Sequence, residues 1–257
     1  MGKNTADALR ASCKKELARI AKQEEKYRSR ERRRITVPMP DKVKKLLDAS
    51  LSKALSLVFE HGGSVTVGGA DGIMAGYEVH DYAVMKRGRR RDVKRLNNGS
   101  RRANGAFTAL TAAEGTVLGI FGIGVPDAAL FSMVLIRGVF RTAMRFGVDV
   151  EDAGERYLLL CMMEASLLDG DEFRKADGRI DDMLTSPPDA DERELTAQSR
   201  RAASALSESM MVMKFIQGIP VAGVVGGVCD PVIYRRVTGY EQMKLYKRYL
   251  LRKLGSI

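Results

Sequence analysis

Five charged residues stand alone in apolar stretches, and their chemistry is the most informative in this sequence. They are Glu114, Asp127, Arg137, Glu164 and Asp230. A buried charge is costly unless it is paired, so the simpler interpretation is interhelical ion pairs and helix caps. The alternative is an internal polar site for a small ligand or for proton transfer, where burial would raise the pKa of the carboxyl groups. Its enzymatic form is a hydrolase that uses Asp127 and Glu114.

The motifs that usually mark catalysis or metal binding do not occur in the sequence. The two histidines, His61 and His80, lie outside any metal-ligand spacing, and there is no CxxC or HExxH pair. A GxSxG nucleophile turn and a GxxxxGK[ST] phosphate loop are also missing. We therefore expect no metal and no cofactor, and we favour a binding protein over an enzyme.

Charge is strongly segregated along the chain. Residues 1–102 carry 25 Lys/Arg against 12 Asp/Glu, residues 103–198 carry 8 against 17, and residues 199–257 carry 10 against 3. The basic ends either meet an anionic partner or fold against the acidic middle. Two basic runs stand out, RSRERRR and KRGRRRDVKRLNNGSRR. Their candidate residues for binding an anionic surface are Arg30, Arg32, Arg33, Arg34, Lys86, Arg87, Arg89, Arg90 and Arg91.

An anionic membrane surface is the partner that these basic runs favour. Each basic residue near an acidic membrane contributes on the order of 1 kcal/mol, so a cluster of this size suffices for peripheral attachment. Nucleic-acid binding is the less favoured alternative, because no aromatic residues interleave with the arginines and no recognised motif surrounds them.

The elements that must position these residues are expected to be helices. Abundant Met, Ala and Leu favour helix over sheet. The longest apolar segment, about residues 104–147, is expected to form a helical hairpin broken by Pro126, with Gly115 and Gly119 as close-packing sites. Its uncharged runs are too short for a membrane span, which needs about 20 apolar residues.

The sequence thus predicts an all-α fold: a single helical domain of packed glycine-rich hairpins with a basic N-terminal helical arm. We place the arm at residues 1–36 and the domain at residues 37–257, with an acidic polar loop at 169–194. Other helices are expected from Asp41 to His61, from Asp149 or Asp152, and from Ser186 to about Phe215. A last, amphipathic and basic helix is expected at 238–254, and a turn at Asn97-Asn98-Gly99.

Several short patterns along the chain resemble those of the EcsC family, which is named for the third product of a bacterial operon that also encodes an ABC transporter. They are the Pro40–Val43 entry to a helix, Glu114-Gly115 with Gly119, Gly124 with Asp127, Phe146-Gly147-Val148-Asp149, Glu155-Arg156, the IPVAGVVGGVCDP segment and the YKRYLLRKL tail. Two features depart from the pattern: the basic runs are richer in charge, and Asp230 occupies a place where Asn is more usual.

The resemblance implies an all-helical bacterial protein on the cytoplasmic side, attached peripherally to the inner face of the cell membrane. Its partner would be the anionic membrane surface or a membrane protein such as an ABC transporter. We therefore expect an accessory or binding protein that works at or near membrane transport.

Overall fold

The structure is a computed structural model that describes residues 2–29, 41–61, 67–118, 127–216 and 231–256. These residues form nine α-helices and no strand, which confirms the all-α prediction. The helices are α1 (Lys3–Arg28), α2 (Asp41–His61), α3 (Ala70–Arg87), α4 (Arg90–Leu118), α5 (Asp127–Met144), α6 (Ala153–Leu167), α7 (Gly170–Met183), α8 (Glu192–Ile216) and α9 (Pro231–Gly255).

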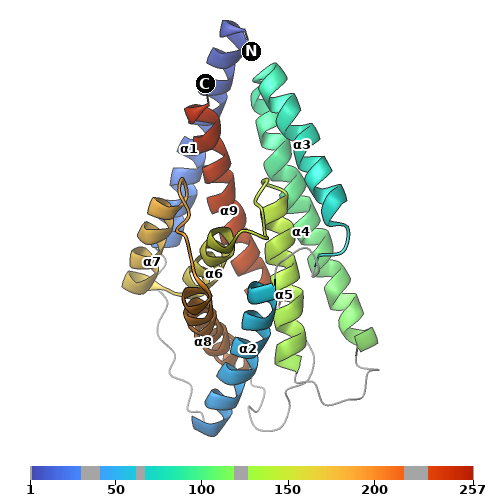
Figure 1. Cartoon of the computed structure of the whole chain (residues 1–257), viewed down its shortest axis with the longest axis vertical. Coiled ribbons are helices and arrows are strands. Elements are labelled where there is room, and N and C mark those ends of the chain that lie inside the picture. Colours follow the sequence, from blue (N-terminus) through green and yellow to red (C-terminus); the bar gives the residue numbers. More distant parts are fainter. Residues whose placement is uncertain (1, 30–40, 62–66, 119–126, 217–230, 257) are drawn as a thin grey trace.

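Helix α9 is the central element of the fold. It runs down the middle of the molecule and packs against α1, α4, α5 and α6 (Figure 1). All residues from Tyr240 to Tyr246 are buried, including polar ones. The prediction of an amphipathic last helix is therefore wrong over this part of α9, because polar side chains such as Gln242 and Lys244 are buried and have partners inside the protein.

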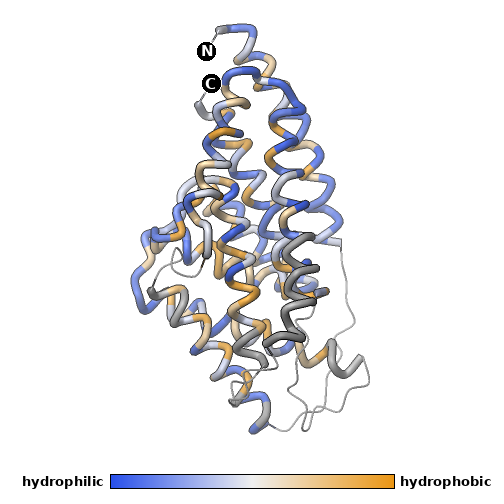
Figure 2. Tube along the Cα trace, turned by 90° about the vertical axis from the view of Figure 1, so that its right-hand side faces the viewer, coloured by the Kyte–Doolittle hydropathy of each residue, from blue (hydrophilic) through white to orange (hydrophobic). Residues whose placement is uncertain are grey.

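A second group of helices packs around α8. Helix α8 contacts α2 and α6, and α2 also packs on α5. The rings of Phe59 in α2 and Phe140 in α5 lie 4.9 Å apart and are fully buried. Helices α3 and α4 form an antiparallel hairpin along one side of the molecule, and hydrophilic positions dominate its outer part in Figure 2.

Helix boundaries follow the sequence wherever a local cap fixes them. Helix α6 begins after Asp152, whose carboxylate accepts a hydrogen bond from Glu155 N at 2.8 Å. Helix α8 begins at Glu192, six residues after the predicted start at Ser186. The cause is a capping box, in which Asp191 and Glu194 each accept a hydrogen bond from the other's backbone N–H.

Two predicted irregular segments are wrong. The acidic stretch 169–194 contains helix α7, because Phe173, Ala176 and Ile180 line one face at helical spacing and are buried. The predicted turn at Asn97–Gly99 lies inside α4, which runs straight through it.

The basic N-terminal segment is also better ordered than a solvated arm. In α1, Leu9, Cys13 and Ile20 are buried, and the helix packs against α9, α4 and α3. The division between residues 36 and 37 stays a prediction, as does the packing role of the glycine-rich turns, since 30–40, 119–126 and 217–230 lie outside the described residues.

Candidate functional site: the basic face of the α3–α4 hairpin

The structure brings only part of the predicted internal polar site into view. Glu114 lies in α4 and Asp127 begins α5, but their side chains lie outside the described part of the chain, as does the whole of Asp230. Arg137 is exposed on α5. A hydrolase site at Asp127 and Glu114 therefore stays a prediction.

Glu164 follows the simpler interpretation. It is half-buried on α6, and its carboxylate accepts a hydrogen bond from Gln198 of α8 at 2.6 Å. Arg201 Nε lies 4.0 Å from the same carboxylate oxygen. The single acid in this apolar helix is thus used to join α6 to α8.

The main cluster of buried charge was not predicted, and it centres on Lys244 of α9. This side chain is fully buried, and its Nζ lies 2.6 Å from Asp177, 2.7 Å from Glu24 and 2.7 Å from Asp181. Burial disfavours the ammonium, but the surrounding carboxylates outweigh it and raise the pKa of Lys244. The spacing of Asp177 and Asp181 by four residues, on one helix face, is the sequence signal that could have indicated this site.

A second buried pair lies further along α9. Arg248, only 2% exposed, forms a bidentate ion pair with Glu155 at the start of α6. Glu155 belongs to the Glu155-Arg156 pair on which the family resemblance partly rests. The basic C-terminal block, residues 199–257, therefore does fold against the acidic middle, and Lys244 and Arg248 of α9 are neutralised inside the protein.

The cations around the α3–α4 turn are arranged differently. The turn itself is fixed, because Gly88 has φ +61° and its carbonyl accepts a hydrogen bond from Ser12 Oγ of α1 at 3.0 Å. One of its arginines is structural: Arg90 Nε donates to the buried carboxylate of Glu16 at 2.7 Å. The other cations at the turn point to solvent.

These exposed cations continue along α4. Arg91, Arg95 and Arg102 follow each other at spacings of four and seven residues, which places them on one side of a helix. Because α4 has no turn at Asn97–Gly99, Arg102 extends the same side of the helix. Arg101 is exposed beside it, about 100° further round the helix axis. Neither residue was among the candidates predicted from the sequence. We call this set the basic ridge: Lys86, Arg87, Arg89, Arg91, Arg95, Arg101 and Arg102.

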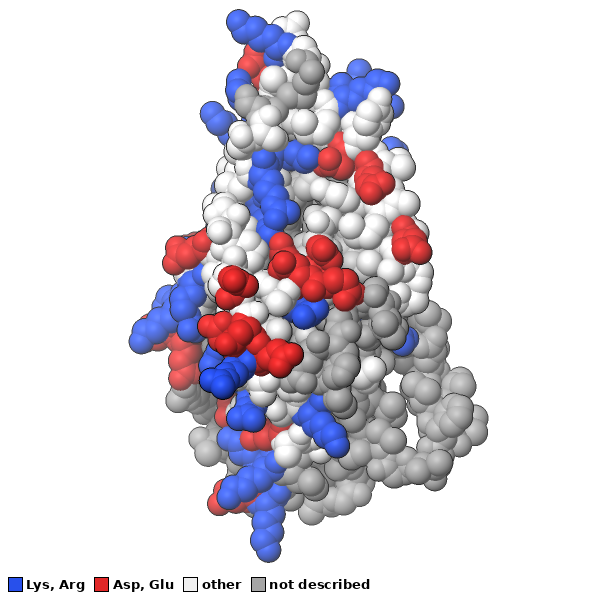
Figure 3. All heavy atoms as spheres, in the orientation of Figure 1, with Lys and Arg blue, Asp and Glu red and all other residues white. Residues whose placement is uncertain are grey.

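The basic ridge is scarcely neutralised. Arg87 and Arg91 each lie 3.9 Å from the buried Asp92. No ion pair holds Arg95, Arg101 or Arg102 to any residue in the described ranges. In Figure 3, Lys and Arg are prominent at the end of the molecule that holds α1 and the α3–α4 turn, whereas Asp and Glu form a band across the middle of this face.

The comparisons with known proteins give one match. A family model described as the EcsC protein family covers residues 11–250 of this chain. No curated protein and no solved structure matched it in these comparisons.

Proposed function

This chain belongs to the EcsC protein family, and from that premise we propose that it is a non-enzymatic helical protein that binds an anionic membrane surface through the basic ridge. The observation that carries the proposal is the row of exposed arginines on α4 without ion-pair partners among the described residues. The expected place of action is the inner face of the cell membrane, beside the lipid itself or a membrane transport protein.

The stability of the fold accounts for only part of the basic ridge, since Lys86 and Arg87 lie in the last turn of α3, where cations favour the helix dipole. Cations near a helix N-terminus oppose the helix dipole, yet α4 begins with Arg90 and Arg91 and is preceded by Arg89. Arg90 has a carboxylate partner at 2.7 Å, and Arg91 lies 3.9 Å from Asp92. No ion pair holds Arg89, Arg95, Arg101 or Arg102 within the described part of the chain. Cations without internal partners are well suited to an external anionic surface, where each contributes about 1 kcal/mol.

An apolar contribution lies beside the ridge on α3. Val79 and Tyr82 are 69% and 65% exposed, and the Tyr82 ring centroid lies 5.5 Å from Lys86 Nζ. Tyrosine is favoured at the membrane–water interface, where its ring and its hydroxyl meet different environments. None of the described helices combines the length and the hydropathy needed to cross a bilayer. These features support attachment at the surface.

The test is flotation of the purified protein with vesicles of phosphatidylglycerol or of phosphatidylcholine, over a salt series. The variant Arg95→Gln/Arg101→Gln/Arg102→Gln removes three unpaired cations from α4. At about 1 kcal/mol each, its partition coefficient on anionic vesicles should fall roughly 100-fold. Binding of the parent protein should weaken as salt screens the charges.

The matched control removes the same charge elsewhere. Lys175, Arg193 and Arg200 are exposed on α7 and α8, so Lys175→Gln/Arg193→Gln/Arg200→Gln should keep most of the binding. An equal loss of vesicle binding in both variants would mean that only net charge matters. It would contradict the proposal that the basic ridge is the binding surface. A gel shift with duplex DNA that is stronger than vesicle binding at the same salt would favour the nucleic-acid alternative.

A further inference from the structure

We propose that a cavity beside the second half of α9 binds a small carboxylate with an apolar or aromatic body. The cavity has a volume of about 190 Å³ and lies between α3, the turn after α5, and α9. It is separate from the basic ridge, and this inference does not depend on membrane binding.

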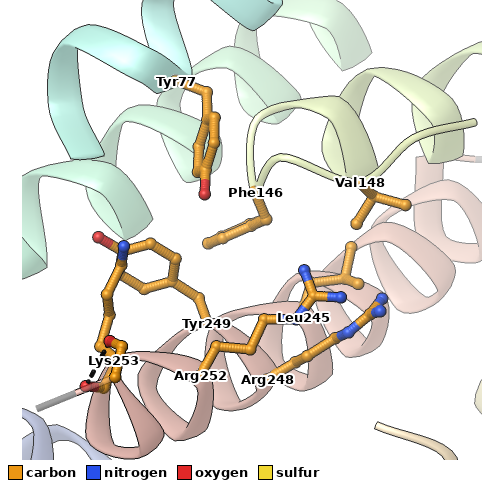
Figure 4. Close-up of a pocket in the computed structure, with 9 residues that line it drawn as sticks. Tyr77, Phe146, Val148, Leu245, Arg248, Tyr249, Arg252 and Lys253 are labelled. Atoms are coloured by element: carbon orange, nitrogen blue, oxygen red, sulfur yellow. Dashed lines mark hydrogen bonds between the residues drawn. The ribbon is translucent and has the colours of Figure 1, made fainter. Parts of the chain in front are cut away.

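The cavity has an apolar part of suitable size. Figure 4 shows Tyr77 of α3 and Phe146 of the turn after α5 above the side chains of α9, with Leu245 and Tyr249 among the residues below. An engineered apolar cavity of about 150 Å³ accepts benzene. The space here therefore admits a ligand with one ring or a short branched chain.

The roof of the cavity is fixed by close packing. Gly147 has φ +72°, and a Cβ atom there would clash with the Tyr77 ring. Only glycine lets the turn after α5 come this close to α3. The rings of Tyr77 and Tyr249 meet edge to face with centroids 6.4 Å apart. The aromatic side chains of Tyr77 and Tyr249 are thus fixed in position without a ligand.

The charged part of the cavity holds one cation more than its carboxylates neutralise. Its cations are Arg248, Arg252 and Lys253. Glu155 is occupied by Arg248, and Asp81 lies 2.6 Å from Lys253 Nζ. Arg252 comes no closer than 3.6 Å to Glu155. The excess of one positive charge fits a ligand with one negative charge, as a carboxylate has.

One further group supports an anionic ligand. Figure 4 shows the Tyr77 hydroxyl on the cavity side of its ring, and it makes no hydrogen bond within the described part of the chain. Burial, with repulsion from Arg248, lowers the pKa of Arg252, which a bound anion would relieve.

Helix stability is an alternative explanation for the cations at Arg252 and Lys253. Both lie in the last turn of α9, where positive charge interacts favourably with the helix dipole. That reason does not extend to the Tyr77 hydroxyl, which has no hydrogen-bond partner within the described part of the chain. The two explanations predict different behaviour toward a ligand.

The experiment is calorimetric titration of the full chain with benzoate and with benzamide, which is nearly the same in shape but uncharged. Benzoate should bind with a Kd on the order of 1 mM, and benzamide at least tenfold more weakly. Arg252→Gln removes the excess charge at a half-exposed side chain and should weaken benzoate binding about tenfold or more. Arg235→Gln, an exposed position on the same helix, should leave it unchanged.

A second variant tests the roof without altering charge. Tyr77→Phe keeps the ring and removes the hydroxyl, so benzoate should bind several-fold more weakly while the thermal midpoint stays close to that of the parent. Equal affinity for benzoate and benzamide, no binding of either, or an unchanged Kd in Arg252→Gln would each overturn the proposal. Preference for dimethyl phosphate over benzoate would overturn the assignment to a carboxylate.

Discussion

Glu241 of α9 should make the stability of this protein fall as the pH rises, and Glu241→Gln should remove that dependence. The side chain is 1% exposed, and neither carboxylate oxygen has a hydrogen-bond partner among the described residues. Burial alone raises its pKa well above the ordinary value of 4.5. In the folded protein the carboxyl group therefore stays protonated at pH values where the unfolded chain ionises.

The size of the effect follows from proton linkage. Above the unfolded pKa the folded state binds one proton more than the unfolded state. The free energy of unfolding then falls by about 1.4 kcal/mol for each pH unit until the folded pKa is reached. The contribution of this group is fully present below pH 4.5 and is lost progressively above it. The amide of the Glu241→Gln variant has nearly the same shape and stays neutral at every pH.

The assay is urea denaturation of both proteins at pH 5, 6, 7 and 8 at constant ionic strength. Relative to Glu241→Gln, the parent should lose about 1.4 kcal/mol per pH unit over the part of this range that lies below the folded pKa. Glu25→Gln, at an exposed position on α1, serves as a control and should run parallel to the parent. All other titrating groups are shared, so the difference isolates Glu241.

Parallel curves for the parent and Glu241→Gln would refute the reasoning. They would mean that the carboxylate is ionised in the folded state, and hence that water or a cation reaches it. A parent that becomes more stable than the variant as the pH rises would point the same way, since it would require a stabilised charge at this position.

Three further outcomes follow from the packing. Lys244→Met should lower the free energy of unfolding in urea by about 3–5 kcal/mol, because it leaves the three carboxylates of Glu24, Asp177 and Asp181 with only Arg28 and Lys247 as cations. Little change would mean that water reaches these carboxylates. Gly88→Ala should cost at least about 2 kcal/mol in a thermal melt, since φ is +61° and the new Cβ would lie 2.5 Å from Thr5 O; an unchanged midpoint would contradict this docked turn. Cys161 should resist iodoacetamide at pH 7.5 in the native protein and react after unfolding, because burial raises the pKa of its thiol to about 12; equal rates in the two states would refute this.

The sequence predicts well the features that local chemistry decides. Helix α2 has its predicted bounds from Asp41 to His61, and α6 starts after Asp152, the second of its two predicted starts. Local signals fail where tertiary packing is stronger. The Asn97–Gly99 turn signal is lost inside α4, since glycine costs only about 1 kcal/mol in a helix and packing can supply that.

The polar residues of α9 show the other limit. The hydrophobic periodicity of this helix predicts that Lys244 and Arg248 lie at the surface. No acidic residue nearby in the sequence pairs with either of them. Their partners lie far away: Lys244 and Glu24 are 220 residues apart, and Arg248 and Glu155 are 93 apart. Isolated charges in apolar stretches are thus a poor guide here, since the buried ion pairs of α9 join Lys244 and Arg248 to acids in hydrophilic segments.

The central place of α9 has a consequence for synthesis of the chain on the ribosome. The helices that it joins, α1, α4, α5 and α6, are all made before it. Until α9 emerges, Glu24 and Glu155 lack the cations that later neutralise them, and Asp177 has only Arg28 of α1. Burying these carboxylates before the α9 cations arrive would be costly, so the core would close in a late and cooperative step. A nascent chain halted before residue 231 should remain sensitive to protease, and release of the next 25 residues of α9 should make it resistant.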